Sequence, residues 1–144
     1  MPSRHQHLAT ASDPAHSAAR EIRRLSEALA LARLAQVLDE ADEWTAWLGA
    51  AVPPAPPSGR PELLALREAS RGFECWLDRA MGHLLALGSE LVRRAEQVRF
   101  AARACLGQPG RGGVDLDAGR RGLEASLLQL ERALARARAE IGPE

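Results

Sequence analysis

Four histidines are the side chains of this 144-residue chain best suited to acid–base or metal chemistry. His5, His7 and His16 fall in a polar N-terminal stretch, while His83 lies beside a long apolar heptad pattern. A zinc site needs cysteine, histidine or carboxylate ligands that complete a set, and no cysteine or carboxylate cluster accompanies the N-terminal histidines. We therefore expect a solvated tail around these three and a structural or solvent-facing imidazole at His83.

Two other groups of residues have the composition of an ion-binding or phosphate-binding site, but neither lies in the local structure that such a site needs. The carboxylates of Asp39, Glu40, Asp42 and Glu43 sit in a helical pattern, whereas Ca²⁺ binding needs a loop with alternating oxygen ligands. The stretch GQPGRGG, residues 107–113, lacks the Lys-Ser/Thr ending of a phosphate loop and follows a helical pattern rather than a strand. The sequence thus predicts no catalytic residue, no metal site, no cofactor and no enzymatic activity.

Composition narrows the class of protein. With 19 acidic and 19 basic residues the net charge is zero, so general nucleic-acid binding is not expected. Apolar residues make up 46% of the chain, enough for one domain with a core. No apolar run approaches the roughly 18 residues of a membrane span, and the N-terminus does not read as a signal peptide. We expect a cytoplasmic protein without an integral membrane segment.

The longest regular pattern predicts one helix over residues 61–106, although the helix-weakening residues Gly82 and Gly88 leave a bend or break there open. Apolar residues recur there at alternating spacings of three and four, the a/d pattern of a helix that lies along partner helices. At about 1.5 Å per residue this helix would be roughly 65–70 Å long. Cys75 and Cys105 would then lie about 45 Å apart along it, too far to form a disulfide. The cysteines therefore indicate a reducing compartment.

Two shorter helices are predicted on either side. Residues 18–48 have a wide apolar face and follow a flexible lead-in over residues 1–17, and residues 116–141 precede a short tail, 142–144. The proline-dense segment AAVPPAPPSGR separates the first two helices, and no strand signal appears anywhere. Short connections favour antiparallel neighbours, so we expect an all-α, antiparallel three-helix bundle with a long middle helix.

The heptad positions predict which side chains form the core of this bundle. Ile22, Leu25 and Leu29 extend the first apolar pattern upstream with a shift in phase, and Trp76 falls at a position that faces the third helix or a partner. A tryptophan on a helical seam is usually part of the core. The predicted core consists of Val37, Trp44, Trp47, Leu48, Phe73, Leu77, Leu84, Leu87, Leu91, Leu127, Leu130 and Leu134.

Several of these segments resemble the spectrin repeat family. The run VLDEADEWTAWL, residues 37–48, is similar to the first helix of such a repeat, with Trp47 at the family's tryptophan position. RRLSEALALARLAQ before it resembles the junction between successive repeats, and LREASRGFECWLDRAMGHLLAL resembles the second helix. In the third helix Leu127 stands where the family usually has tryptophan. The resemblance implies a left-handed three-helix repeat, covering residues 18–141, from a longer or related protein of the cytoskeleton or membrane skeleton.

The function implied is a non-enzymatic spacer or protein–protein interaction module. Its partners would be neighbouring repeats or cytoskeletal and adaptor proteins, and oligomerisation stays open. Arg93, Arg94, Arg99 and Arg103 form a basic group on the second helix that would suit weak contact with an acidic partner or anionic lipid.

Two alternatives remain at this stage. Trp47-Leu48-Gly49 resembles the helix-ending motif of the small WXG-type helical-hairpin proteins of a bacterial secretion system. A helical adaptor or regulator of an enzyme is the other.

Overall fold

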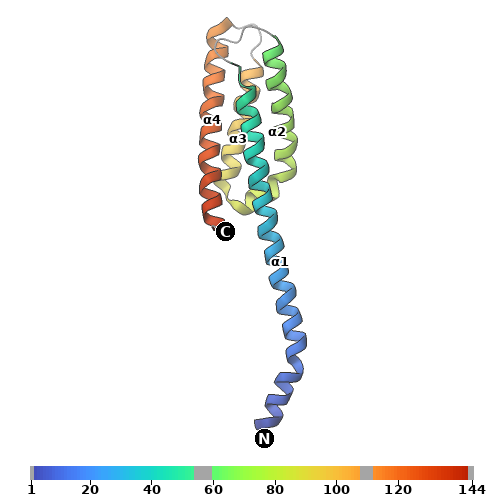
Figure 1. Cartoon of the computed structure of the whole chain (residues 1–144). Coiled ribbons are helices and arrows are strands. Elements are labelled where there is room, and N and C mark those ends of the chain that lie inside the picture. Colours follow the sequence, from blue (N-terminus) through green and yellow to red (C-terminus); the bar gives the residue numbers. More distant parts are fainter. Residues whose placement is uncertain (1, 54–59, 108–111, 143–144) are drawn as a thin grey trace. The chain divides into compact units, whose positions relative to one another are not determined.

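The computed structural model describes the backbone of residues 2–53, 60–107 and 112–142, and the side chains of residues 14–53, 63–107 and 117–142. Four helices and no strand occur in these ranges: α1 Pro2–Ala51, α2 Arg60–Leu87, α3 Ser89–Leu106 and α4 Gly112–Ile141 (Figure 1). The all-α prediction is therefore confirmed. None of the described helices is long and apolar enough to cross a membrane. Most of the proline-dense connection and of GQPGRGG lies outside the described residues.

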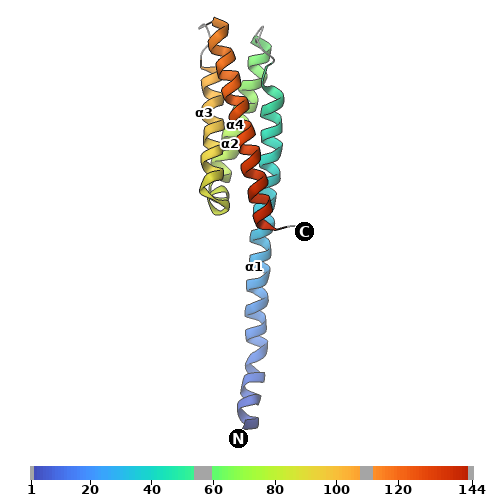
Figure 2. The same cartoon turned by 90° about the vertical axis from the view of Figure 1, so that its left-hand side faces the viewer.

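The helix expected over residues 61–106 is not continuous: it breaks at Gly88, one of the two glycines where a break was left open, and the chain folds back there. Helix α2 ends at Leu87 and α3 begins at Ser89. Arg99 pairs with Asp78 at 3.3 Å and Arg103 pairs with Glu74. Residues 21 and 29 positions apart would lie about 30–45 Å apart on one straight helix, so these ion pairs require an antiparallel hairpin (Figure 2).

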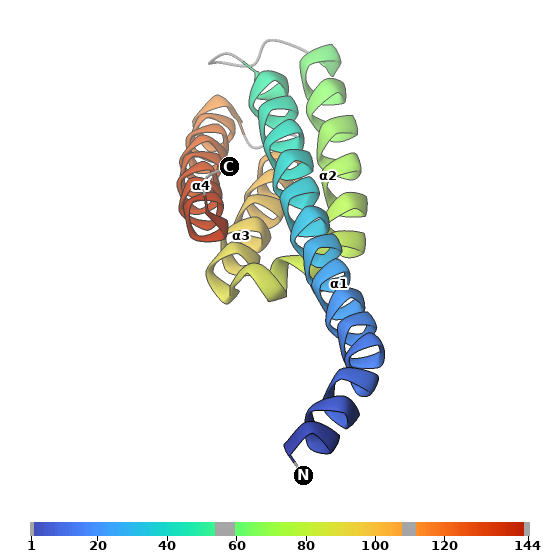
Figure 3. The same cartoon turned by 60° about the horizontal axis from the view of Figure 1, so that its bottom comes forward.

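The expected three-helix bundle is therefore a four-helix bundle, formed by residues 34–144 as one compact unit. Polar contacts identify the neighbours of each helix. Glu40 on α1 accepts a hydrogen bond from Trp76 on α2, and Arg138 on α4 pairs with Asp42 on α1 at 2.5 Å. Helix α4 also contacts α3 through Arg94 and Gln129, 2.7 Å apart. Each helix thus packs antiparallel to two neighbours, in the order α1, α2, α3, α4 around the bundle (Figure 3).

The core runs through the middle of these four helices, and most of the predicted core residues lie in it. The buried ones are Val37, Leu48, Phe73, Leu77, Leu84, Leu91, Leu127, Leu130 and Leu134. Trp44 and Leu87 are partly buried and pack against them. Helix α3 contributes mostly small or β-branched side chains, such as Ala95, Val98 and Ala102. Small side chains allow helices to approach closely. The small buried residues of α3 therefore let it pack beside α2 and α4 as an additional helix of the bundle.

The N-terminal part of α1, residues 1–33, is a unit of its own. Helix α1 begins at Pro2, within the segment expected to be a flexible lead-in. Alanine, arginine and glutamate are strong helix formers, and Pro14 is the one proline inside the helix. Every side chain described in this unit, from Pro14 to Arg33, is exposed.

Candidate interaction surface

The N-terminal unit carries a stripe of exposed apolar side chains. Ile22, Leu25 and Leu29 are 65%, 55% and 71% exposed. Together with Ala18 and Ala32 they follow spacings of four, three, four and three, which place them on one face of a helix. We call these five residues the N-terminal stripe. From the sequence, Ile22, Leu25 and Leu29 were expected only to extend the first apolar pattern; their shift out of the phase of the core pattern is the signal that marks them as a candidate site.

The basic group predicted on the second helix is largely occupied by partners within the bundle. Arg99 pairs with Glu96 as well as with Asp78, and Arg103 pairs with Glu74. The hydrogen bond to Glu74 raises the pKa of Arg103. Carboxylates from α2 balance the guanidinium groups of Arg99 and Arg103. These two arginines therefore connect α3 to α2 and do not form a uniformly basic surface.

Arg94 also has partners within the bundle, because its guanidinium donates hydrogen bonds to the exposed side chains of Gln97 and Gln129. Arg93 instead lines an open groove of about 750 Å³ between α3 and α4. The floor of that groove is made of small residues, among them Ala101, Gly119 and Gly122. Phe100, also at this groove, is 77% exposed. The four predicted arginines are thus divided between internal contacts and one groove edge.

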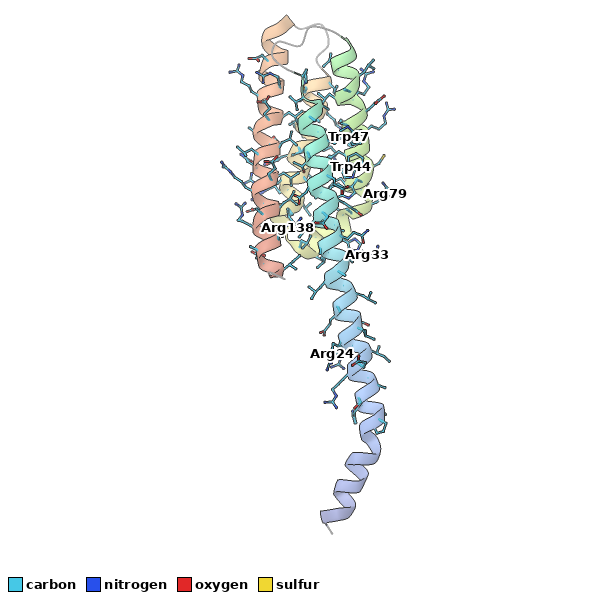
Figure 4. All side chains as sticks on the ribbon, viewed as in Figure 1. Arg24, Arg33, Trp44, Trp47, Arg79 and Arg138 are labelled. Carbon is cyan, nitrogen blue, oxygen red and sulfur yellow. The ribbon has the colours of Figure 1, made fainter. Side chains whose placement is uncertain are left out.

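Of the two tryptophans of α1, Trp47 differs from its predicted role, whereas Trp44 packs against the core. Trp47 was expected in the core but is 48% exposed, because Leu48 points inward in its place. Trp44 packs on Trp47, with ring centroids 4.9 Å apart, and its indole covers Gly72 of α2 (Figure 4). A Cβ atom at Gly72 would lie 2.5 Å from the Trp44 ring. Helix α1 continues through Gly49 to Ala51, so the Trp-Leu-Gly motif does not end it.

Part of the acidic cluster on α1 has structural partners. Trp76 is buried, and its Nε1 donates a 2.9 Å hydrogen bond to Glu40, which is itself partly buried. Asp39 and Asp42 both pair with Arg138, at 3.1 and 2.5 Å. These ion pairs raise the pKa of Arg138. The expected solvated face is confirmed for Asp39, Asp42 and Glu43, which are all exposed, although Asp39 and Asp42 also join α1 to α4 and the partly buried Glu40 joins it to α2.

Within the described side chains, no group of three or more histidine, cysteine, aspartate or glutamate residues is arranged to hold a metal ion. His16 is exposed and His83 is partly buried, while His5 and His7 lie outside the described side chains. Cys75 and Cys105 are both free thiols. The 45 Å separation expected for them assumed a straight helix and does not apply to the hairpin. Burial raises the pKa of Cys105, so its reactive thiolate is disfavoured.

No family model, curated protein or solved structure matches this chain. The resemblance to spectrin repeats therefore stays a prediction from the residues quoted above.

Proposed function

We propose that the chain is a non-enzymatic helical interaction module, in which the bundle serves as a stiff body and the N-terminal stripe binds a protein partner. The observation that carries this proposal is the exposure of Ile22, Leu25 and Leu29 on one helical face. Contiguous exposed apolar surface on a soluble protein usually marks a binding site. A helix with one apolar face is suited to a groove or to a partner helix.

Stiffness of the bundle supports the spacer part of the proposal. Ion pairs or hydrogen bonds join each helix of the bundle to both of its neighbours, and one continuous apolar core fills the interior. Because a packed interior resists deformation, such a body would hold its attached partners at a fixed spacing. The spectrin resemblance implies a cytoplasmic protein associated with the cytoskeleton, and we propose that setting for this module.

The test compares two triple-serine variants of the full chain. The first replaces Ile22, Leu25 and Leu29 and removes the large apolar residues of the stripe. The matched control replaces Arg23, Glu27 and Ala30, which lie on the same helical segment but off the stripe, and it leaves the net charge unchanged. Both sets are exposed, so thermal unfolding of the bundle should be unaffected in either variant.

Each variant is fused to a proximity-labelling ligase and expressed in its native cells. We expect labelling of the specific partner set to fall at least tenfold for the first variant and to be retained for the control. Equal labelling by the wild type and both variants would contradict the proposal.

A further inference from the structure

The connection between α2 and α3 consists of a single residue, Gly88, in a conformation that favours glycine. Its φ and ψ angles are 147° and 148°, in a region that residues with a side chain rarely adopt. A Cβ atom added there would meet nothing within 4 Å, so the demand for glycine arises from the backbone rather than from crowding. The Gly88 N–H still donates to the carbonyl of Leu84 at 3.0 Å, as in a continuing helix.

The heptad pattern passes through this turn without a change of phase. Leu77, Leu84, Leu91, Val98 and Cys105 follow one another at intervals of seven residues, and all five are buried. A seven-residue repeat is the pattern of one continuous helix packed along its length. A straight helix over residues 60–106 would therefore present the same apolar residues on one face.

The contacts across the hairpin do not depend on the two helices belonging to the same copy. Asp78 with Arg99 and Glu74 with Arg103 join α2 to α3 at positions nearly symmetric about Gly88. If Gly88 became helical, α3 and α4 would leave α1 and α2 of their own chain. The vacated surface would then be complementary to the α3–α4 pair of a second copy, because it is the surface that this pair already covers.

We propose that the faces of α1 and α2 that contact α3 and α4 are also a binding surface for a second copy of the chain. In this dimer α2 and α3 form one long helix, and each bundle contains α1–α2 of one chain and α3–α4 of the other. Exchange of identical elements is a low-cost route to a dimer when the connecting segment is short. The proposal does not depend on the N-terminal stripe or on the function proposed for it.

Three variants of the full chain test the role of the hinge by sedimentation velocity over a range of concentrations. Gly88→Ala disfavours the turn and favours a helix, so the dissociation constant of the dimer should fall at least tenfold. Gly82→Ala is the control, because Gly82 is helical in both forms and has open space around it. Inserting Gly-Ser-Gly after Gly88 relaxes the turn and should leave only monomer. A Gly88→Ala chain that stays monomeric like the Gly82→Ala control would overturn the proposal.

Chemical crosslinking distinguishes exchange of helices from other modes of dimerisation. Arg103→Lys introduces the only lysine of the chain, beside Glu74, and a carbodiimide can join the two side chains through an amide with loss of water. In the monomer this amide forms within one chain. In the exchanged dimer it joins two chains, and the covalent product has twice the mass on a denaturing gel.

Arg103→Lys is also combined with Gly88→Ala, where we expect the double-mass product linked at Glu74. A dimer in which the amide between Glu74 and the introduced lysine stays within one chain would overturn the exchange. If Gly88→Ala fails to fold, the Arg103→Lys chain is refolded at high and at low concentration. Interchain linkage that increases with concentration supports the proposal, and purely intrachain linkage at both concentrations contradicts it.

Discussion

The Nε1–H of Trp76 donates a 2.9 Å hydrogen bond to Glu40, across the interface between α2 and α1. The Trp76 ring is buried against Phe73, with ring centroids 5.7 Å apart. A buried indole N–H without a partner costs about 1–3 kcal/mol. The bond therefore fixes how α1 sits on α2 in addition to the apolar packing between them.

Replacing Glu40 with alanine should destabilise the bundle by about 1–3 kcal/mol, because the N–H of Trp76 loses its acceptor. Glu40→Gln keeps a carbonyl oxygen at the same place and should cost clearly less. Urea unfolding of both variants measures the difference. In a double-mutant cycle, Glu40→Ala should cost little once Trp76→Phe has removed the donor, and additive effects of the two changes would contradict the assignment.

Gly72→Ala should destabilise the bundle by about 1–3 kcal/mol, although alanine is the better helix former. The added Cβ would lie 2.5 Å from the Trp44 ring, which is held in place by Trp47. Gly82→Ala offers the matched comparison on the same helix, since it meets open space and should stabilise by up to about 1 kcal/mol. Thermal or urea unfolding that shows both changes stabilising would argue against the contact between Trp44 and Gly72.

Adjacent residues of α1 should respond very differently to truncation. Leu48→Ala empties a fully buried position and should cost about 2–5 kcal/mol. Trp47→Ala removes a ring that is about half exposed and should cost about 1 kcal/mol. The comparison is made by urea unfolding of the two variants. A larger loss for Trp47 than for Leu48 would restore the buried role that the spectrin resemblance implied for the tryptophan.

Acidification should weaken the bundle through two surface carboxylates. A hydrogen bond from Arg136 lowers the pKa of Glu90, and one from Arg120 lowers the pKa of Asp117. A carboxyl whose pKa is lower in the folded than in the unfolded state stabilises the fold above its unfolded pKa. That contribution is lost as the pH falls from about 4 through the folded pKa values.

Urea midpoints measured between pH 6 and pH 2.5 should therefore decline at the acid end. In Glu90→Gln and Asp117→Asn the decline should be shallower by a small amount, because both carboxyls lie at the surface, partly exposed, and are screened by solvent. Glu43→Gln is a control, since Glu43 is exposed. A profile as steep in the double variant as in this control would contradict the role of the two ion pairs.

Much of this protein was predictable from the sequence because helix formation and heptad spacing are local properties. The spacing of Leu77, Leu84, Leu91 and Val98 predicts helices with one buried face, and the structure buries all four. The spacing of Leu127, Leu130 and Leu134 predicts the buried face of α4 in the same way. What the spacing does not reveal is which helix covers which face, because a heptad looks the same against any partner.

The tertiary structure decided the fold-back at Gly88, the exposure of Trp47 and the pairing of the arginines on α3. Glycine inside a helix costs about 1 kcal/mol, a small bias compared with the apolar surface that α2 and α3 cover when they lie side by side. Within a single chain, that long-range burial favours the hairpin over the straight helix. The same fold-back brings Asp78 to Arg99 and Glu74 to Arg103, so the charges of this surface also depend on contacts between residues far apart in the chain.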